Sequence, residues 1–485
     1  MKELCLTVTL PSLQVTIPEG KLNFQYLEKF VFNLTKIIGQ HVLTEILQFL
    51  DNKLRKERQR GELSNCGKRS KYLLTLLGNI TYQKHLYRDK EGRYRGLLDE
   101  TLGLNPNQRM STHYQKITGL FSFLAGSYHN AQRFLEYCYG DSVSFEAIRR
   151  QVQLQGSQIQ RQEEYAFDQN LEEALKPTTL TPKSNREPLY LEIDGTMIHL
   201  QKQQKKKAEL KLAIIHQGKE KRYPSGNSDA KKLKDKLAYT GLGPADEFMA
   251  QVSLLAEEKF HLYDHNLILV GGDGAPWIKE GAKDYFPHSI YQLCPFHLKR
   301  KLIQHLSYNR KRKSEISSLL GEGNLPEALI LLEEEKGKNP PKKDELNELI
   351  TYLVNNSEGI NAVDRLKEAG LPVDTMGAIE GNIDKILANR FKKRGMSWSL
   401  TGALNLAKVG QLIINDDWDD FWPKEPEVIL KQIEPKEEDH FPKEDKYDRR
   451  YSLPVLVGPH QDKSWVKQLK EFISCLLYTS DAADE

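Results

Sequence analysis

The chain has 485 residues, 39% of them hydrophobic and 28% charged, which is typical of a globular protein with roughly two to four domains. Its formal net charge of only +3 does not indicate a nucleic-acid binder, and no apolar run approaches the length of a membrane span. The first residues lack the pattern of a secretory signal, and five scattered cysteines suit a reducing compartment, so we expect a cytoplasmic protein.

The first predicted elements are a long helix and a hairpin. Apolar residues recur at helical spacing over Phe24–Lys56. The run from Tyr72 to Asp89, a turn at Lys90–Gly92 and a short second arm then predict antiparallel strands. This part of the chain is therefore expected to be helical with one small β element.

Three helices are predicted next. Two of them, Ser111–Ala125 and Tyr128–Tyr139, precede a break at Gly140, after which a third helix begins. A helix, a short turn and a helix with an exposed basic side form the outline of a helix-turn-helix. We expect DNA contacts from Arg149 and Arg150 on the third helix, although most helix pairs of this kind are only packed against each other.

A polar, proline-containing linker then leads into an α/β region. Helices are predicted at Ala245–Phe260 and up to Tyr285, and almost everything from Cys294 to about Gly370 is expected to be helical. The segment Met376–Ser399 is expected to begin as another helix. The predicted strands are Leu189–Gln201, Leu210–His216, Leu237–Thr240, Leu267–Val270 and Ser289–Leu293.

Three acidic residues stand where a ligand could be reached. Asp194 interrupts the first of these strands, Asp273 follows a later strand between two glycines, and Glu380 lies among small residues after the helical segment. Each of them alone is more often a turn, cap or solvated residue. Together they could hold two divalent cations roughly 3.5–4 Å apart, an arrangement used for in-line attack on phosphodiesters. Carboxylate oxygens suit Mg²⁺ or Mn²⁺.

Four stretches carry a family resemblance: YLEIDGT, GGDGAPWI, YQLCPFHLKR and GAIEGNIDKILANRFKKRGMSWS. They resemble the ISLre-type insertion-sequence transposases of bacteria, which are DDE enzymes with Mutator-like relatives. The resemblance covers residues Tyr72 to Lys408. One position departs from it, because those proteins usually have Gly-Ser before the Glu-Gly pair and this chain has Gly377-Ala378.

The resemblance implies an α/β fold with a ribonuclease-H-like catalytic core, in which a mixed sheet has flanking helices. It also implies an all-helical insertion and a mainly helical N-terminal DNA-binding region. The implied protein is a transposase that binds terminal inverted repeats and catalyses metal-dependent phosphodiester cleavage and strand transfer. Asp194, Asp273 and Glu380 would be its catalytic residues and would bind two Mg²⁺ or Mn²⁺ ions. Its partner would be double-stranded DNA, bound by a homo-oligomer at the nucleoid and away from any membrane.

The expected regions follow from these elements. The tail CLLYTSDAADE matches a translated sequencing adapter, so we interpret it as foreign to the protein and expect the natural C-terminus to be missing. The regions are an N-terminal helical region (1–70), a hairpin and helix-turn-helix DNA-binding region (71–180), the catalytic core in two parts (181–297 and 376–410), the insertion (298–375), an irregular acidic region (411–474) and the tail (475–485).

Further residues are assigned roles around the three acids. Cys294 and His297 lack the two additional ligands of a zinc site, so we expect them to be structural or substrate-positioning. Asp384, one helical turn after Glu380, is a reserve candidate for the third carboxylate. Basic side chains near the site are expected to grip phosphates, and Trp398 could stack on an unpaired base, although a core tryptophan is the commoner role. The expected DNA-contacting residues are Arg149, Arg150, Lys299, Arg300, Lys301, Arg390, Lys392, Lys393, Arg394 and Trp398.

Three other functions fit part of the pattern. A haloacid-dehalogenase-like phosphatase has similar Asp-Gly-Thr and Gly-Asp-Gly motifs, but its nucleophile would fall at Glu192, where that family needs aspartate. A catalytically inactive DNA-binding relative and a ribonuclease-H-type nuclease without strand transfer also stay open. Metal-dependent nicking of DNA with inverted-repeat ends would separate these functions.

Overall fold

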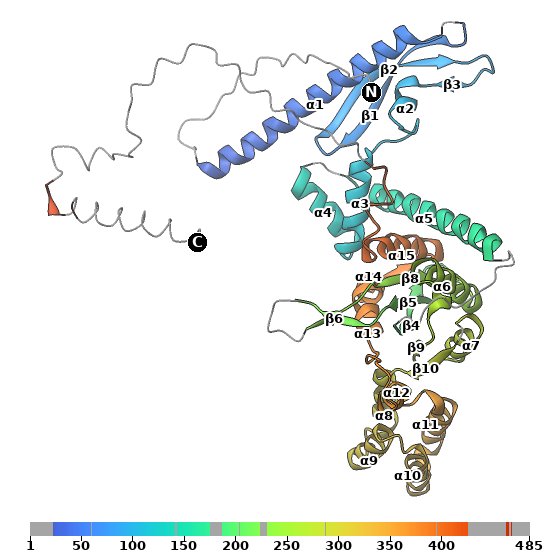
Figure 1. Ribbon diagram of the computed structural model, residues 1–485. Helices are drawn as coiled ribbons and strands as arrows, with labels where there is room; N and C mark the ends of the chain where they lie inside the picture. Colours follow the sequence, from blue (N-terminus) through green and yellow to red (C-terminus); the bar gives the residue numbers. More distant parts are fainter. Residues whose placement is uncertain are drawn as a thin grey trace. The chain divides into compact units, whose positions relative to one another are not determined.

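The computed structural model describes residues 23–424, apart from 60, 141–142, 175–186, 203, 224–229, 287 and 394, and also residues 462–464 and 467 (Figure 1). The fold is mixed α/β, with a mixed sheet and many helices. The expected tail at 475–485, most of the acidic region at 411–474 and Arg394 lie outside the described residues.

The predicted N-terminal helix is confirmed as α1, Phe24–Glu57, and the hairpin prediction needs a correction. Strand β1 (Ser64–Thr75) turns back at Leu76 and Leu77 into β2 (Gly78–Arg88), and β3 (Tyr94–Arg95) follows the predicted turn near Gly92. The first turn could not be recognised from the sequence, because the two central residues of the turn are leucines. Thr75 closes this turn, since its hydroxyl donates to the Gly78 carbonyl at 2.9 Å.

Serine caps define the next helices. The hydroxyls of Ser111, Ser127 and Ser144 each accept the main-chain N–H three residues later. These caps begin α3 (Thr112–Leu124), α4 (Tyr128–Tyr139) and α5 (Phe145–Ala174), after the five-residue helix α2 (Leu97–Thr101).

Helix α5 packs against α15 (Leu400–Ile414), a helix that the sequence analysis did not predict. The two backbones approach closely at Gly156, where an added Cβ would lie 2.3 Å from the carbonyl oxygen of Asn405. Buried polar contacts tie the same helices together, including an ion pair between Lys408 and Glu163 at 2.7 Å. Helix α5 is therefore a packing element along much of its length.

We expect Gly156→Ala and Gly337→Ala to change stability in opposite directions. The new methyl group at position 156 would push α5 and α15 apart and lower the free energy of unfolding by about 1–3 kcal/mol. At Gly337, in helix α10 (Leu325–Lys338), nothing lies within 4 Å of an added Cβ. Alanine there should raise the free energy of unfolding by up to about 1 kcal/mol through helix propensity alone. Urea unfolding followed by circular dichroism measures both, and equal effects would contradict the close packing at Gly156.

The central sheet contains all five predicted strands. Its order is β10-β9-β4-β5-β8, and β11 (Ser397–Trp398) pairs with the end of β4. Strands β4, β9 and β10 are parallel, whereas β5 is antiparallel to both β4 and β8. A short β6-β7 ribbon lies in the basic segment. The strand bounds are β4 Leu189–Leu200, β5 Lys207–His216, β6 Lys219–Lys221, β7 Lys231–Leu233, β8 Leu237–Gly241, β9 Ile268–Gly272 and β10 Ser289–Leu293.

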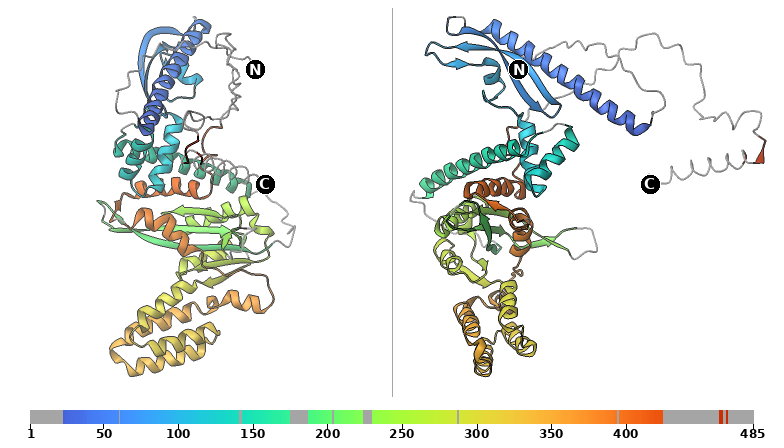
Figure 2. Two further views of the ribbon diagram at one scale, coloured as in Figure 1. Left: turned by 90° about the vertical axis from the view of Figure 1, so that its left-hand side faces the viewer. Right: turned by 180° about the vertical axis from the view of Figure 1, so that it is seen from behind.

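Both faces of this sheet are covered by helices (Figure 2). On β5, Leu212 and Ile214 pack into the core shared with α5 and α15, while Ala213 and Ile215 pack on the opposite face. That opposite face is covered by α6 (Ala245–Phe260) and α7 (Pro276–Tyr285). The result is a layered α/β/α arrangement.

Between β10 and the Glu380 segment, the chain forms helices with a core of their own. None of the helices in the described part of the chain combines the length and apolar character that a membrane span requires. The helices after β10 are α8 Pro295–Leu306, α9 Arg310–Gly321, α10 Leu325–Lys338, α11 Lys343–Asn355 and α12 Ala362–Glu368.

Candidate functional site

Alternate residues of β4 explain why this strand contains acids. Leu189, Leu191 and Ile193 enter the core beneath α6 and α7. Because side chains alternate along a strand, Tyr190, Glu192 and Asp194 point to the other face. That face carries the segment leading to Glu380, so β4 has one apolar face and one polar face.

The three acids predicted from the sequence line one cavity. Asp194 lies on β4, Asp273 directly follows β9, and Glu380 lies on α13 (Ile379–Asn382). The cavity measures ≈ 700 Å³. Its walls also include His297, Phe296, Arg300, Lys301, Gln304, Tyr352, Asp384 and Lys392.

Burial controls the ionisation of Asp194, which is only 8% exposed. Loss of solvent raises the pKa of Asp194 to about 6; His297 acts in the opposite direction, and the charges of Asp273 and Glu380 raise the pKa further. A cation bound beside this carboxylate would favour its charged form. The Oδ1 atom accepts the N–H of Gly195 at 2.7 Å.

The Gly-Asp-Gly loop places Asp273 against the helical insertion. Its carboxylate accepts the N–H of Ala275 at 2.9 Å, and its carbonyl accepts the hydroxyl of Tyr352 at 2.9 Å. Gly274 has φ +98°, and a Cβ there would lie 2.8 Å from the Tyr352 ring. The glycine is therefore needed for both the turn and the approach of α11.

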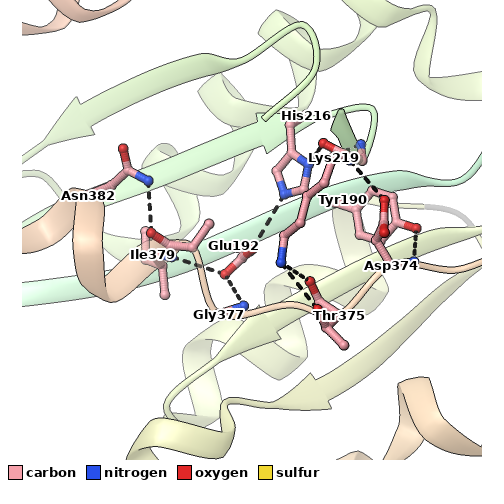
Figure 3. A network of polar contacts seen from close by, with 11 residues as sticks. Tyr190, Glu192, His216, Lys219, Asp374, Thr375, Gly377, Ile379 and Asn382 are labelled. Carbon is pink, nitrogen blue, oxygen red and sulfur yellow. Dashed lines mark hydrogen bonds and ion pairs between the residues drawn. The ribbon is translucent and has the colours of Figure 1, made fainter. Parts of the chain in front are cut away.

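A buried anchor on β4 holds the segment that carries Glu380 (Figure 3). Glu192 is 1% exposed, and its Oε2 atom accepts the N–H groups of Gly377 at 2.9 Å and Ile379 at 3.1 Å. Its Oε1 atom lies 3.4 Å from Nε2 of His216. This corrects the predicted helix start at Met376: the chain has no regular secondary structure over residues 371–378, φ at Gly377 is +121°, and the helix begins at Ile379.

Two more contacts hold the same segment (Figure 3). The N–H of Asp374 donates to the Tyr190 hydroxyl at 2.7 Å, and the Asp374 carboxylate accepts the N–H of Lys219 at 2.8 Å. The Lys219 ammonium donates to the Thr375 carbonyl at 2.6 Å. The approach to Glu380 is thus fixed from β4 and β6. Sequence reasoning missed this role of Glu192, which it considered only as a phosphatase nucleophile.

Cys294 and His297 lie beside Glu380, as expected for near-site residues. The Cys294 thiol donates to Oε1 of Glu380. The same oxygen lies 3.4 Å from Nδ1 of His297, whose Nε2 lies 3.9 Å from Oδ2 of Asp194. Burial acts to raise the pKa of Glu380, but the contacts with His297 and Cys294 outweigh it and hold this pKa below its usual range.

The predicted phosphate-gripping residues divide into two groups. Arg300, Lys301 and Lys392 line the cavity, whereas Lys299 is exposed and does not line it. Lys393 forms an ion pair with Asp384 at 2.6 Å. Asp384, the reserve carboxylate, therefore already has a cationic partner at the cavity's edge.

The side chains of two predicted DNA contacts are largely buried within the fold. Arg390 is 3% exposed, donates from Nε to the Ser122 carbonyl at 3.0 Å, and lies over the rings of Tyr128 and Trp398. Trp398 is 8% exposed and donates from its ring nitrogen to the Phe391 carbonyl at 3.0 Å. Neither side chain is presented to a nucleic acid in this structure, and Trp398 has the alternative role of a core residue.

The two arginines of the predicted helix-turn-helix are exposed on the first turns of α5. Arg149 and Arg150 both pair with Glu146, at 2.8 and 3.1 Å. The hydrogen bond from Arg149, together with that from Arg150, lowers the pKa of Glu146 to about 2. Ile148 and Val152, on the apolar stripe, are fully buried.

Comparison with known proteins places the chain among uncharacterised relatives. The model of a family described as "Uncharacterised protein family (UPF0236)" matches residues 18–418. A UPF0236 protein of Caldanaerobacter subterraneus subsp. tengcongensis whose name joins eleven locus designations is 26% identical over 80% of this chain and 77% of its own length. The "UPF0236 protein in vanSb 3'region" of Streptococcus gallolyticus is 22% identical over 78% of this chain and 80% of its own.

These findings correct the family resemblance drawn from the sequence motifs. The matched family is UPF0236, and nothing in the comparisons links the chain to ISLre-type transposases. The motifs that suggested the resemblance do form the cavity, but short motifs around three acids do not define a family.

Proposed function

We propose a function for this chain, which belongs to the uncharacterised protein family UPF0236: it is a DNA transposase that cleaves phosphodiester bonds and transfers the strand ends with the help of divalent cations. The observation that carries the proposal is the meeting of Asp194, Asp273 and Glu380 in one cavity, from positions far apart in the sequence. Carboxylates brought together in this way are the ligand set of two-cation phosphodiester chemistry.

The architecture supports a ribonuclease-H-like core. The strand path β10-β9-β4-β5-β8 is mixed, helices cover both faces, and a helical insertion separates β10 from Glu380. Asp194 on the central strand and Asp273 after its parallel neighbour are the positions that such a core would use. The same geometry would serve a nuclease, so strand transfer is the finer part of the proposal.

The donor set fits Mg²⁺ or Mn²⁺, because the carboxylates of Asp194, Asp273 and Glu380 offer hard oxygen ligands. Two bound cations would activate the attacking hydroxyl and stabilise the leaving oxygen. The protein's own part is to hold these carboxylates in place and to exclude water around Asp194. Arg300, Lys301 and Lys392, on the cavity wall, would bind the phosphates on either side of the scissile bond.

The DNA substrate and its context follow from chemistry and from one relative's name. Basic side chains beside the three carboxylates would bind the phosphates of a nucleic acid. Our proposed substrate is double-stranded DNA with inverted-repeat ends. The name of one relative joins eleven locus designations. A mobile element that multiplies within a genome produces many loci that encode the same protein. We place the reaction in the bacterial cytoplasm, with at least two copies of the chain holding the two ends.

The phosphatase alternative has no nucleophile of the required kind. Glu192, the residue at that position, is buried, holds two main-chain N–H groups and does not line the cavity. Hydrolysis of small phosphomonoesters is therefore not expected.

The test is a cleavage assay with the full chain and DNA that contains the sequences flanking its own reading frame. We expect nicks at the ends of the element and joined products in Mg²⁺ or Mn²⁺, and none in the presence of EDTA. DNA that is bound without being nicked, or rapid hydrolysis of a phosphomonoester in place of nicking, would overturn the proposal.

A further inference from the structure

We propose that Cys294, His297 and Glu380 form a binding site for a transition-metal ion of the zinc class. This site shares Glu380 with the carboxylate set described above, but its other donors are sulfur and nitrogen. The inference stands without DNA cleavage, because it concerns which metal the protein binds. It assigns Cys294 and His297 the metal-binding role that the sequence pattern alone did not support.

The geometry of the three donors is that of a metal site. Cys294 precedes α8, His297 lies one turn later on the same helix, and Glu380 comes from α13. One donor atom from each residue, the Sγ atom, a ring nitrogen and a carboxylate oxygen, lies within 4.8 Å of the other two. Around a tetrahedral zinc ion with bonds of about 2.0–2.3 Å, such atoms lie about 3–4 Å apart, so small shifts would complete the site.

The surroundings of His297 provide a second observation. Its Nδ1 atom is buried, and its contact with Oε1 of Glu380, at 3.4 Å, is longer than a good hydrogen bond. Buried polar atoms are usually paired, and a bound cation would satisfy this one. The other ring nitrogen lies 3.9 Å from the Asp194 carboxylate. A carboxylate behind a metal-bound histidine is a common arrangement that orients the ring.

The donor chemistry selects the class of metal. A thiolate and an imidazole favour Zn²⁺ or Co²⁺ over Mg²⁺. The Cys294 thiol would bind after losing its proton to solvent. Three protein donors leave one position of a tetrahedral ion open for water or a phosphate oxygen, and two of these donors, His297 and Glu380, line the cavity.

The competing interpretation is that the thiol only positions Glu380 through its hydrogen bond. Cobalt(II) distinguishes the two, because a cobalt–thiolate bond gives a near-ultraviolet charge-transfer absorption that a hydrogen bond does not give. The full chain is titrated with Co²⁺ in a background in which the other cysteines, Cys5, Cys66, Cys138 and Cys475, are serine. Zn²⁺ affinity is measured by calorimetry on the same protein, with Mg²⁺ as the comparison.

We expect one equivalent of Co²⁺ to bind with the charge-transfer band, and Zn²⁺ to displace it. In Cys294→Ser, which keeps a hydroxyl to donate to Glu380, the band should vanish. In Cys294→Ser and in His297→Gln the Zn²⁺ affinity should fall about a hundredfold or more. Removal of a direct ligand should lower the affinity at least as much as removal of a residue that only contacts a ligand. Gln304→Ala is the matched control, because Gln304 lines the same cavity without being a donor to this ion, and both the band and the Zn²⁺ affinity should be unchanged in this variant.

Co²⁺ binding without the band in the protein that retains Cys294 would overturn the proposal, and this result needs no variant at Cys294. Unchanged Zn²⁺ affinity in a folded Cys294→Ser would overturn it as well. A protein that shows the band and fails to cleave DNA would refute the proposed transposase activity while leaving the metal site in place.

Discussion

Asp194→Asn is expected to lower metal-dependent DNA cleavage roughly a thousandfold, since a metal ligand contributes several kcal/mol to transition-state stabilisation. The substitution keeps the shape of the side chain and removes its negative charge. Asparagine would still accept the N–H of Gly195, so we expect the fold to survive. The measurement is the initial rate of nicking at saturating Mg²⁺ or Mn²⁺, with DNA binding followed separately by gel shift.

Asp384→Asn is the matched control for this prediction. Asp384 also lines the cavity, but its side chain is 56% exposed and is paired with Lys393. We expect this variant to keep its cleavage rate within a few-fold of the wild type. Loss of cleavage in Asp384→Asn with retention in Glu380→Gln would reassign the third carboxylate to Asp384, and wild-type cleavage by Asp194→Asn would remove Asp194 from the site.

The second large effect is expected for Glu192→Leu. This change leaves the N–H groups of Gly377 and Ile379 without their acceptor, and the buried one, that of Ile379, costs about 1–3 kcal/mol when it is unpaired. The free energy of unfolding should fall accordingly, the segment before Glu380 should loosen, and cleavage should be lost with it. Urea unfolding measures the stability, and hydrogen exchange of a peptide covering Asp374–Asn382 measures the loosening.

Glu192→Gln separates this positioning role from a general packing role. Glutamine has nearly the same volume and retains a carbonyl oxygen for the two N–H groups, so it should recover most of the protection and cleavage that leucine loses. If Glu192→Leu kept its hydrogen-exchange protection at Gly377 and Ile379, another contact would have to hold the segment. Asp194→Asn should leave that protection unchanged, since the acceptor of both N–H groups is Glu192.

The strands and most helices could be predicted because they depend on local patterns. Alternating or continuous apolar runs marked the five strands of the central path, and the break at Gly140 separated α4 from α5. The turn at Leu76-Leu77 was missed because leucine there satisfies the pattern of a strand. Helix α15 was missed because its residues are apolar on nearly all sides, without the one-sided pattern that identifies a surface helix.

The site could be predicted only as far as residue type is informative. The three carboxylates were found because an acid within a strand or between glycines is conspicuous. The roles of Glu192 and Arg390 were not found, because burial and hydrogen-bond partners arise from contacts between distant segments. The gathering of Cys294, His297 and Glu380 is of the same kind: two donors lie three residues apart in the sequence, and the third comes from beyond the insertion.

The position of the helical insertion has a consequence for biosynthesis. Asp194 and Asp273 leave the ribosome well before Glu380, and the helices between β10 and the Glu380 segment have a core that can form first. A nascent chain would therefore carry two of the three acids before the third is translated, and one face of the sheet would lack its cover until α15 has followed. Under the proposed function, cleavage of the DNA that encodes the protein would have to wait until synthesis has passed α15.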